Sequence, residues 1–144
     1  MTGPQIVLGT GGQVLVEPTP PAALERDTDV LGAPVHMGIC GSDVHVLHGR
    51  HPFAKPPVVT GHEVVARVLA VGTQVTAVAP GDLAVVNPLV WCGECERCRA
   101  GVVNQCANAA VRGFRVPGLA RGEVVVDAAY CHRVPTGIDT LRPC

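Results

Sequence analysis

The sequence contains few aromatic residues and no excess of charge of either sign. Its 144 residues include two Phe, one Trp and one Tyr, so a core must be built from Val, Leu, Ile and Ala, and the abundance of Val favours strands over helices. Eleven Lys and Arg against 12 Asp and Glu leave a formal net charge of -1, which provides no basic surface for nucleic acid or anionic lipid. We therefore expect a mainly β protein with no nucleic-acid partner.

Long apolar runs are missing as well. Arg67, Asp82 and Asn87, together with glycines and prolines, interrupt every stretch that approaches the roughly 18 apolar residues of a membrane span. The segment Met1–Gln5 has no basic start followed by an apolar stretch, so no secretory signal is predicted. We expect a cytoplasmic protein without a membrane partner. In such a reducing compartment, clustered cysteines are more often metal ligands or catalytic thiols than disulfides.

The length and composition fit one domain over residues 1–144. Hydrophobic residues make up 47% of the chain and charged residues 16%, which is enough apolar material for a packed core. With 17 Gly and 13 Pro, the pieces between turns are short and helices have little room. Strands are predicted at Ile6–Leu8, at Val14–Val16, at about residues 29–37, at 58–71, at Leu83–Val86 and at about 123–134.

Local residue types refine this prediction. Gly11 and Gly12 supply the positive φ angles of a hairpin turn. A dinucleotide-binding loop is disfavoured there, because Val14 stands where G-x-G-x-x-G needs its last Gly. Residues 32–34, Gly-Ala-Pro, predict an edge position or a bulge in their strand. Ser42 is predicted to cap a short helix that follows it.

A lobe at about residues 91–107 shows neither a strand period nor a helical period, yet it carries four cysteines. Their spacing, Cys92-x2-Cys95-x2-Cys98-x7-Cys106, lets a loop wrap one tetrahedral Zn²⁺. The metal would replace the missing core, and with no position open to water the site would be structural. Two disulfides, a thioredoxin-type C-x-x-C and a nucleic-acid-binding zinc ribbon are the alternatives.

A second group of chemically active residues lies earlier in the chain, in the segments Cys40-Gly-Ser42-Asp43-Val-His45 and Gly-His62-Glu63. Taken separately, a lone Cys and a lone His are usually a buried thiol and a satisfied imidazole. A catalytic zinc, however, needs a small ligand set with one position open for a substrate oxygen. A serine hydroxyl can donate and accept a proton, and a histidine that titrates at about 6.5 can pass that proton to solvent.

The order of the motifs resembles one family. Gly-Ile-Cys-Gly-Ser-Asp, Lys-Pro-Pro, Gly-His-Glu, Pro-Gly-Asp and the four-cysteine pattern follow one another as in the N-terminal catalytic domain of the zinc-dependent medium-chain alcohol dehydrogenases, in the polyol and threonine dehydrogenase branch. The resemblance runs from about Gln5 to the end of the chain. It implies a GroES-like, partly open β-barrel with a zinc-binding loop lobe, and oxidation of a small alcohol or polyol with NAD or NADP.

The resemblance also implies roles for individual residues. Cys40 and His62 would bind a catalytic zinc, with Glu63 as the third ligand or a close alternate. Asp43 would orient the imidazole of His62, and Ser42 and His45 would form a proton relay. The second, structural zinc would be held by the lobe cysteines, which are Cys92, Cys95, Cys98 and Cys106.

A complete member of that family carries a Rossmann-type domain after this one, and no such domain is present in the sequence. The nicotinamide cofactor would therefore require a complementary Rossmann domain, and association into a homo-oligomer stays open. The alternative function is a truncated, non-catalytic zinc-stabilised barrel or interaction module. A zinc-free quinone reductase of the same superfamily is disfavoured, because it would have no use for Cys40, His62 or the lobe.

The remaining polar and aromatic residues receive ordinary structural interpretations. His36 and His132 are expected in sheets, and His48 and His51 in solvated loops. Trp91 and Phe53 are candidates for pocket walls, and Cys131 and Cys144 for unpaired thiols. Ala66 stands where the family usually has Gly, which has no side chain.

Overall fold

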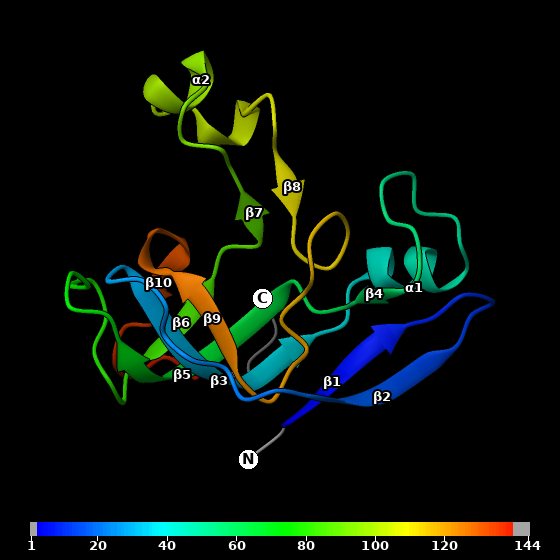
Figure 1. Cartoon of the computed structure of the whole chain (residues 1–144), viewed down its shortest axis with the longest axis horizontal. Helices are drawn as coiled ribbons and strands as arrows, with labels where there is room; N and C mark the ends of the chain where they lie inside the picture. The colour runs from blue at the N-terminus through cyan, green and yellow to red at the C-terminus, as the bar shows by residue number, and fades with distance from the viewer. Residues whose placement is uncertain (1–2, 140–144) are drawn as a thin grey trace.

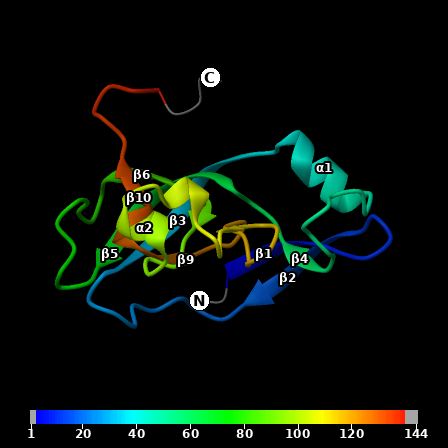
Figure 2. The same cartoon turned by 90° about the horizontal axis from the view of Figure 1, so that it is seen from above.

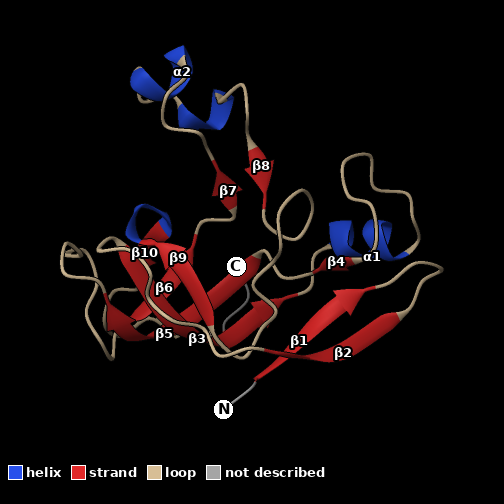
Figure 3. Cartoon of the chain, in the orientation of Figure 1, coloured by secondary structure: helices blue, strands red, loops and turns tan. Residues whose placement is uncertain are grey.

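Short strands dominate the computed structural model, which describes residues 3–139 (Figures 1 and 3). The strands are β1 (Gly3–Leu8), β2 (Val14–Thr19), β3 (Asp29–Gly38), β4 (Val58–Val59), β5 (Glu63–Val71), β6 (Leu83–Val86), β7 (Leu89–Val90), β8 (Ala110–Val111), β9 (Val124–Asp127) and β10 (Cys131–Arg133). The helices are α1 (Gly41–Leu47) and α2 (Glu96–Arg99), with 3₁₀ turns η1 (Val103–Gln105) and η2 (Ala128–Tyr130). No helix within residues 3–139 has the length and apolar character needed to cross a membrane.

The largest sheet has the strand order β10-β6-β5-β3-β9, and all its neighbouring strands are antiparallel. Burial alternates along β5, where Val64, Ala66 and Val68 face the core, and along β9, where Val124 and Val126 do the same. This period of two is the pattern of a sheet with one buried face. The sheet curls into a half-barrel around that core, which confirms the predicted mainly β, partly open barrel.

A three-stranded sheet, ordered β2-β1-β4, positions the longer helix. Leu8 on β1 packs with Val46 of α1 and with Ala54, and Val46 is completely buried. The helix α1 is thereby fixed at the opposite end of the molecule from β10 and β6 (Figure 2). The predicted hairpin between β1 and β2 is confirmed, with φ of 77° at Gly11 and 80° at Gly12.

The single strand predicted over residues 58–71 is wrong. The chain forms β4 and β5 in two different sheets, because two of the three residues between them bond elsewhere. The carbonyls of Thr60 and Gly61 accept the N–H groups of Ala120 and Leu119, and Gly61 has φ of 94°, a conformation that favours glycine. His62 therefore lies at the crossing from one sheet to the other.

The interruption predicted at residues 32–34 is a bulge, and the edge position is wrong. The β3–β5 register shifts between Leu31 and Gly32 and again between Pro34 and His36. β3 lies between β5 and β9. Pro34 is tolerated there because β9 pairs only with residues Asp29–Gly32, so the proline removes no donor from that ladder.

Two further local predictions need correction. The N-cap of α1 is Cys40 and not Ser42. The backbone N–H of Cys40 donates to Oδ2 of Asp43 at 3.0 Å, which ties the start of the helix to its own first turn. The strand predicted over 123–134 is divided by η2 into β9 and β10, since the side chain of Asp127 accepts the N–H of Ala129 and turns the chain.

Candidate metal centres

The four-cysteine lobe stands apart from the sheets on the short β7–β8 ribbon (Figure 1). Ligand atoms of all four cysteines lie within 4.8 Å of one another. Sγ of Cys106 is 3.5 Å from Sγ of Cys92, which is 4.0 Å from Sγ of Cys98. A tetrahedral site with Zn–S bonds of about 2.3 Å requires sulfurs about 3.8 Å apart, so these distances fit zinc. They are far too long for disulfides.

The lobe has almost no core of its own. Neither α2 nor η1 contains a buried residue, and Cys106 is the one cysteine of the four that is fully buried. The turns are held by backbone bonds such as Arg99 N–H to the carbonyl of Cys95, at 2.9 Å. A segment with so little buried apolar surface needs another source of order, and a bound metal would supply it.

Backbone N–H groups directed at the sulfurs favour thiolates. The N–H groups of Ala107 and Cys98 lower the pKa of Cys95 to about 6, and those of Glu94 and Cys95 lower the pKa of Cys92. Burial, together with the neighbouring Cys95 sulfur, raises the pKa of Cys98 to about 12. Four sulfurs this close cannot all carry a charge by themselves, and a divalent cation would remove that conflict.

The second cluster consists of Cys40, His62 and Glu63, whose ligand atoms also lie within 4.8 Å of one another. The β3–β5 ladder brings them together, because Gly38 pairs directly with Glu63 and Cys40 and His62 lie just beyond that pair. A Cβ at position 38 would overlap the carboxylate of Glu63, so a glycine there leaves the carboxylate its place. His62 is buried, Cys40 half-buried and Glu63 exposed.

Asp43 lies behind the imidazole of His62. Its Oδ1 accepts the hydroxyl of Thr60 at 2.6 Å and lies 3.6 Å from Nδ1 of His62, while Oδ2 accepts the N–H of Cys40. Nδ1 of His62 is buried and has no hydrogen-bond partner among the described residues. The carboxylate is thus held in place next to that nitrogen. Nothing in the sequence indicated the part that Thr60 plays.

The two residues predicted as a relay lie on α1. Ser42 is half-buried in the first turn, next to Cys40, and His45 is exposed in the last turn. Residues three apart on a helix share a face. Within the described part of the chain no hydrogen bond joins the two side chains, so the structure places them near each other without linking them.

Aromatic rings form a wall beside His62, and the sequence analysis missed the part that Phe114 plays in it. The ring of Phe114 lies 4.9 Å from that of His62 and stacks on His51 at 4.3 Å. His51 lies in a loop, as predicted, but it is half-buried: its ring is stacked and its Nδ1 accepts the N–H of Ala54 at 3.1 Å. The guanidinium carbon of Arg115 lies over the ring of Phe53, 5.1 Å from the ring centroid. With only two Phe, one Trp and one Tyr in the chain, Phe114 could have been singled out from the sequence as a rare aromatic residue.

The other histidines and cysteines lie away from the clusters. His36 and His132 lie on β3 and β10, as predicted, and His48 is exposed. Trp91 packs edge-on against Tyr130, with ring centroids 4.5 Å apart. Cys131 is unpaired, and burial raises its pKa to about 11. Cys144 lies outside the described residues.

Known proteins resemble this chain in sequence and in structure. The family model of the alcohol dehydrogenase GroES-like domain matches residues 26–136. A 2-dehydro-3-deoxy-L-galactonate 5-dehydrogenase of Pseudoalteromonas atlantica is 37% identical over 105 residues, which cover 72% of this chain and 31% of the relative. The chain thus spans about a third of the length of the curated relatives it matches.

Two solved structures illustrate the structural likeness. The galactitol-1-phosphate dehydrogenase of Escherichia coli has a TM-score of 0.85 and 28% identity, covering 94% of this chain and 39% of that one. A short chain alcohol dehydrogenase from Escherichia coli CFT073, in complex with the cofactor NADH, has a TM-score of 0.84 and 29% identity, covering 96% and 40%.

Proposed function

The chain belongs to the alcohol dehydrogenase GroES-like domain family, as its motifs predicted, and on this premise we propose that it is the zinc- and substrate-binding domain of an NAD(P)-dependent alcohol or polyol dehydrogenase. Its residues 1–144 would act as one catalytic domain. The observation that carries the proposal is the convergence of Cys40, His62 and Glu63, backed by the carboxylate of Asp43.

The donor set of this cluster fits a catalytic zinc. A thiolate, an imidazole and a carboxylate make three protein ligands, which leaves a fourth tetrahedral position for a substrate. The buried Nδ1 of His62 faces Asp43. That carboxylate favours the proton on Nδ1, so the lone pair of Nε2 is free for a metal. Zinc at this centre would polarise an alcohol hydroxyl and lower its pKa.

Ser42 and His45 would carry the hydroxyl proton to solvent. Ser42 lies two residues from Cys40 and is half-buried, so its hydroxyl can accept a proton from a substrate held at the centre and donate its own. His45, on the exposed turn of the same helix, can receive that proton and release it to water. The rigid attachment of α1 through Val46 would keep both side chains in place.

The aromatic wall would shape the substrate site. Phe114 shields one side of His62 from water, and its stacking with His51 holds the ring in position. Exclusion of water strengthens the electrostatic interactions that polarise a hydroxyl. The substrate would be a small alcohol or polyol, as for the dehydrogenases that this chain resembles.

The lobe would hold a second zinc with a structural role. Cys92, Cys95, Cys98 and Cys106 fill all four positions of a tetrahedron, so such an ion has no place for a substrate. The nicotinamide cofactor would bind to a complementary Rossmann domain of a longer protein, because this chain covers only about a third of its relatives. The hydride acceptor, NAD or NADP, would meet the substrate between the two domains.

Zinc stoichiometry tests the proposal. The purified, zinc-reconstituted chain should contain two zinc ions, and Cys40→Ser should contain one, as measured by elemental analysis against protein concentration. Cys131→Ala removes a buried thiol outside both clusters and should keep two. One zinc in the wild type, unaffected by Cys40→Ser, would refute the catalytic site and favour a non-catalytic zinc-stabilised barrel.

A further inference from the structure

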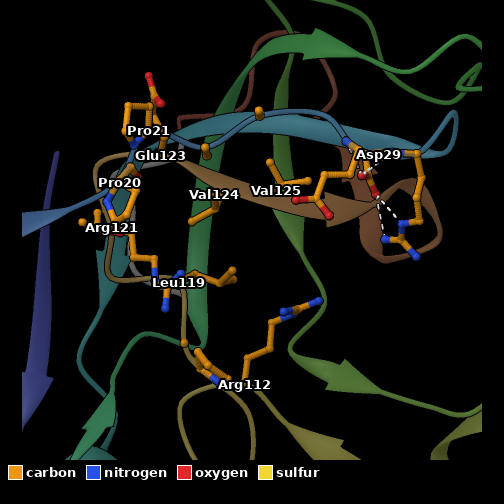
Figure 4. Close-up of a pocket in the computed structure, with 16 residues that line it drawn as sticks. Pro20, Pro21, Asp29, Arg112, Leu119, Arg121, Glu123, Val124 and Val125 are labelled. Carbon is orange, nitrogen blue, oxygen red and sulfur yellow. Dashed lines mark hydrogen bonds and ion pairs between the residues drawn. The ribbon is translucent and has the colours of Figure 1, made fainter. Parts of the chain in front are cut away.

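A cavity of about 570 Å³ lies apart from both candidate metal centres and shares no residue with them (Figure 4). It is bounded by the loop that joins β2 to β3, by the start of β9 and by the segment that precedes it. Pro20, Pro21, Leu119 and Val124 contribute apolar wall, and its volume is within the range of small-molecule sites.

Two arginines that line this cavity have incomplete hydrogen bonding. Nε of Arg112 and Nε of Arg121 are buried and have no hydrogen-bond partner among residues 3–139, and neither guanidinium forms an ion pair with a described residue. Arg26, in the same wall, is different because its Nε and NH2 donate to Oδ1 of Asp29 at 3.0 and 2.7 Å. Buried donors without partners are uncommon in folded proteins.

Arg112 is partly buried, which makes its missing hydrogen-bond partner more significant. Its guanidinium lies over the ring of Tyr130, 5.4 Å from the centroid, and burial lowers the pKa of Arg112. Figure 4 shows Arg112 and Arg121 reaching into the cavity on either side of Leu119. Two unpaired guanidinium groups beside one hollow match the planar, bidentate geometry of a carboxylate or a phosphate.

Carboxylates at the margin limit the charge of a ligand. Glu25 is exposed, and Glu123 lies near Pro21, at the other end of the cavity from Arg112 (Figure 4). A polyanion would be repelled by these groups more strongly than a small oxyanion that carries a single charged group. We propose that this cavity binds a small oxyanion, the carboxylate or phosphate group of a small molecule, through Arg112 and Arg121.

The only tryptophan of the chain provides the readout. Trp91 contacts Tyr130, over which Arg112 lies, so a ligand on Arg112 should change Trp91 fluorescence. The full chain is titrated with inorganic phosphate and, in a second arm, with acetate, at constant ionic strength set by chloride, and calorimetry follows the same titrations. Saturable binding in either arm supports the proposal, and the arm that saturates identifies the oxyanion.

Variants decide whether the two arginines are responsible. Arg112→Gln and Arg121→Gln should each weaken binding about tenfold or more, since each removes a charged hydrogen-bond donor. Arg97→Gln removes the same charge from an exposed position of the lobe and should leave the affinity unchanged. Among the described residues the cation–π contact with Tyr130 is made by Arg112, so Arg121→Gln guards against a merely structural effect at Arg112. Absence of saturation in both arms, or equal affinity in all three variants, would overturn the proposal.

Discussion

The two clusters of candidate metal ligands are assembled in opposite ways. The lobe cysteines lie within residues 92–106, and a few turns bring them together with almost no buried apolar surface. Cys40 and His62 are separated by α1 and a proline-rich loop, and the β3–β5 ladder and the Asp43 bonds bring them together. The lobe would therefore depend on a bound metal for its structure, whereas the barrel would present the second cluster without one.

The largest expected effect comes from breaking the lobe. Cys95→Ser should remove one zinc and the order of residues 91–107, because coupled metal binding in small cysteine sites is worth on the order of 10 kcal/mol. Hydrogen exchange should show fast amides in the lobe and unchanged protection in β5 and β6. If the lobe amides of the metal-free wild type were protected as well as those of the zinc-bound chain, the lobe would not need a metal for its structure.

An intermediate effect is expected at Asp43, which links the second cluster to the fold. Asp43→Ala leaves the Cys40 N–H and the Thr60 hydroxyl without their acceptor and should lower the free energy of unfolding by about 2 to 3 kcal/mol. Zinc affinity at Cys40 and His62 should fall about 10- to 100-fold, measured with a competing chelator.

Thr60→Val is the matched control for that variant. It removes one of the two hydrogen bonds and should cost about 1 kcal/mol, with a smaller loss of zinc affinity. A larger loss of zinc affinity in Thr60→Val than in Asp43→Ala would show that the carboxylate is not what orients His62.

The smallest effect is a pH dependence of the barrel itself. Burial would raise the pKa of Asp29, but bonds from the Arg26 side chain and from the N–H groups of Arg26 and Glu25 outweigh it and hold that pKa below its usual value. A carboxylate with a lowered pKa stabilises the fold above its unfolded pKa of about 3.9 and loses this contribution as the pH falls through the folded pKa.

Thermal unfolding measures this contribution when it is followed from about pH 5 to about pH 3, a range that spans the unfolded pKa. Asp29→Asn should be less stable than the wild type at pH 5, by about 1 kcal/mol since Arg26 is largely exposed. The difference should shrink as the pH falls. A constant difference would mean that Asp29 acts through its shape and not through its charge.

Sequence reasoning identified local features well and failed where segments bond to distant partners. The hairpin at Gly11 and Gly12 follows from residues that adjoin one another. The break between β4 and β5 does not, because it depends on residues 118–120, far along the chain. The glycine at position 32 and the alanine at position 66 are also linked through space. A side chain at Gly32 would crowd the methyl group of Ala66.

By itself, the sequence determined that this chain is a mainly β domain of a recognisable family and that four of its cysteines share one site, because motif order and short spacing are properties of the linear chain. The tertiary structure decided that Thr60 and Cys40 together hold Asp43 behind His62, that Phe114 covers the same imidazole, and that Arg112 and Arg121 share a cavity. These contacts join residues from different strands and loops, so they come into being only when the sheets pair and curl around a common core.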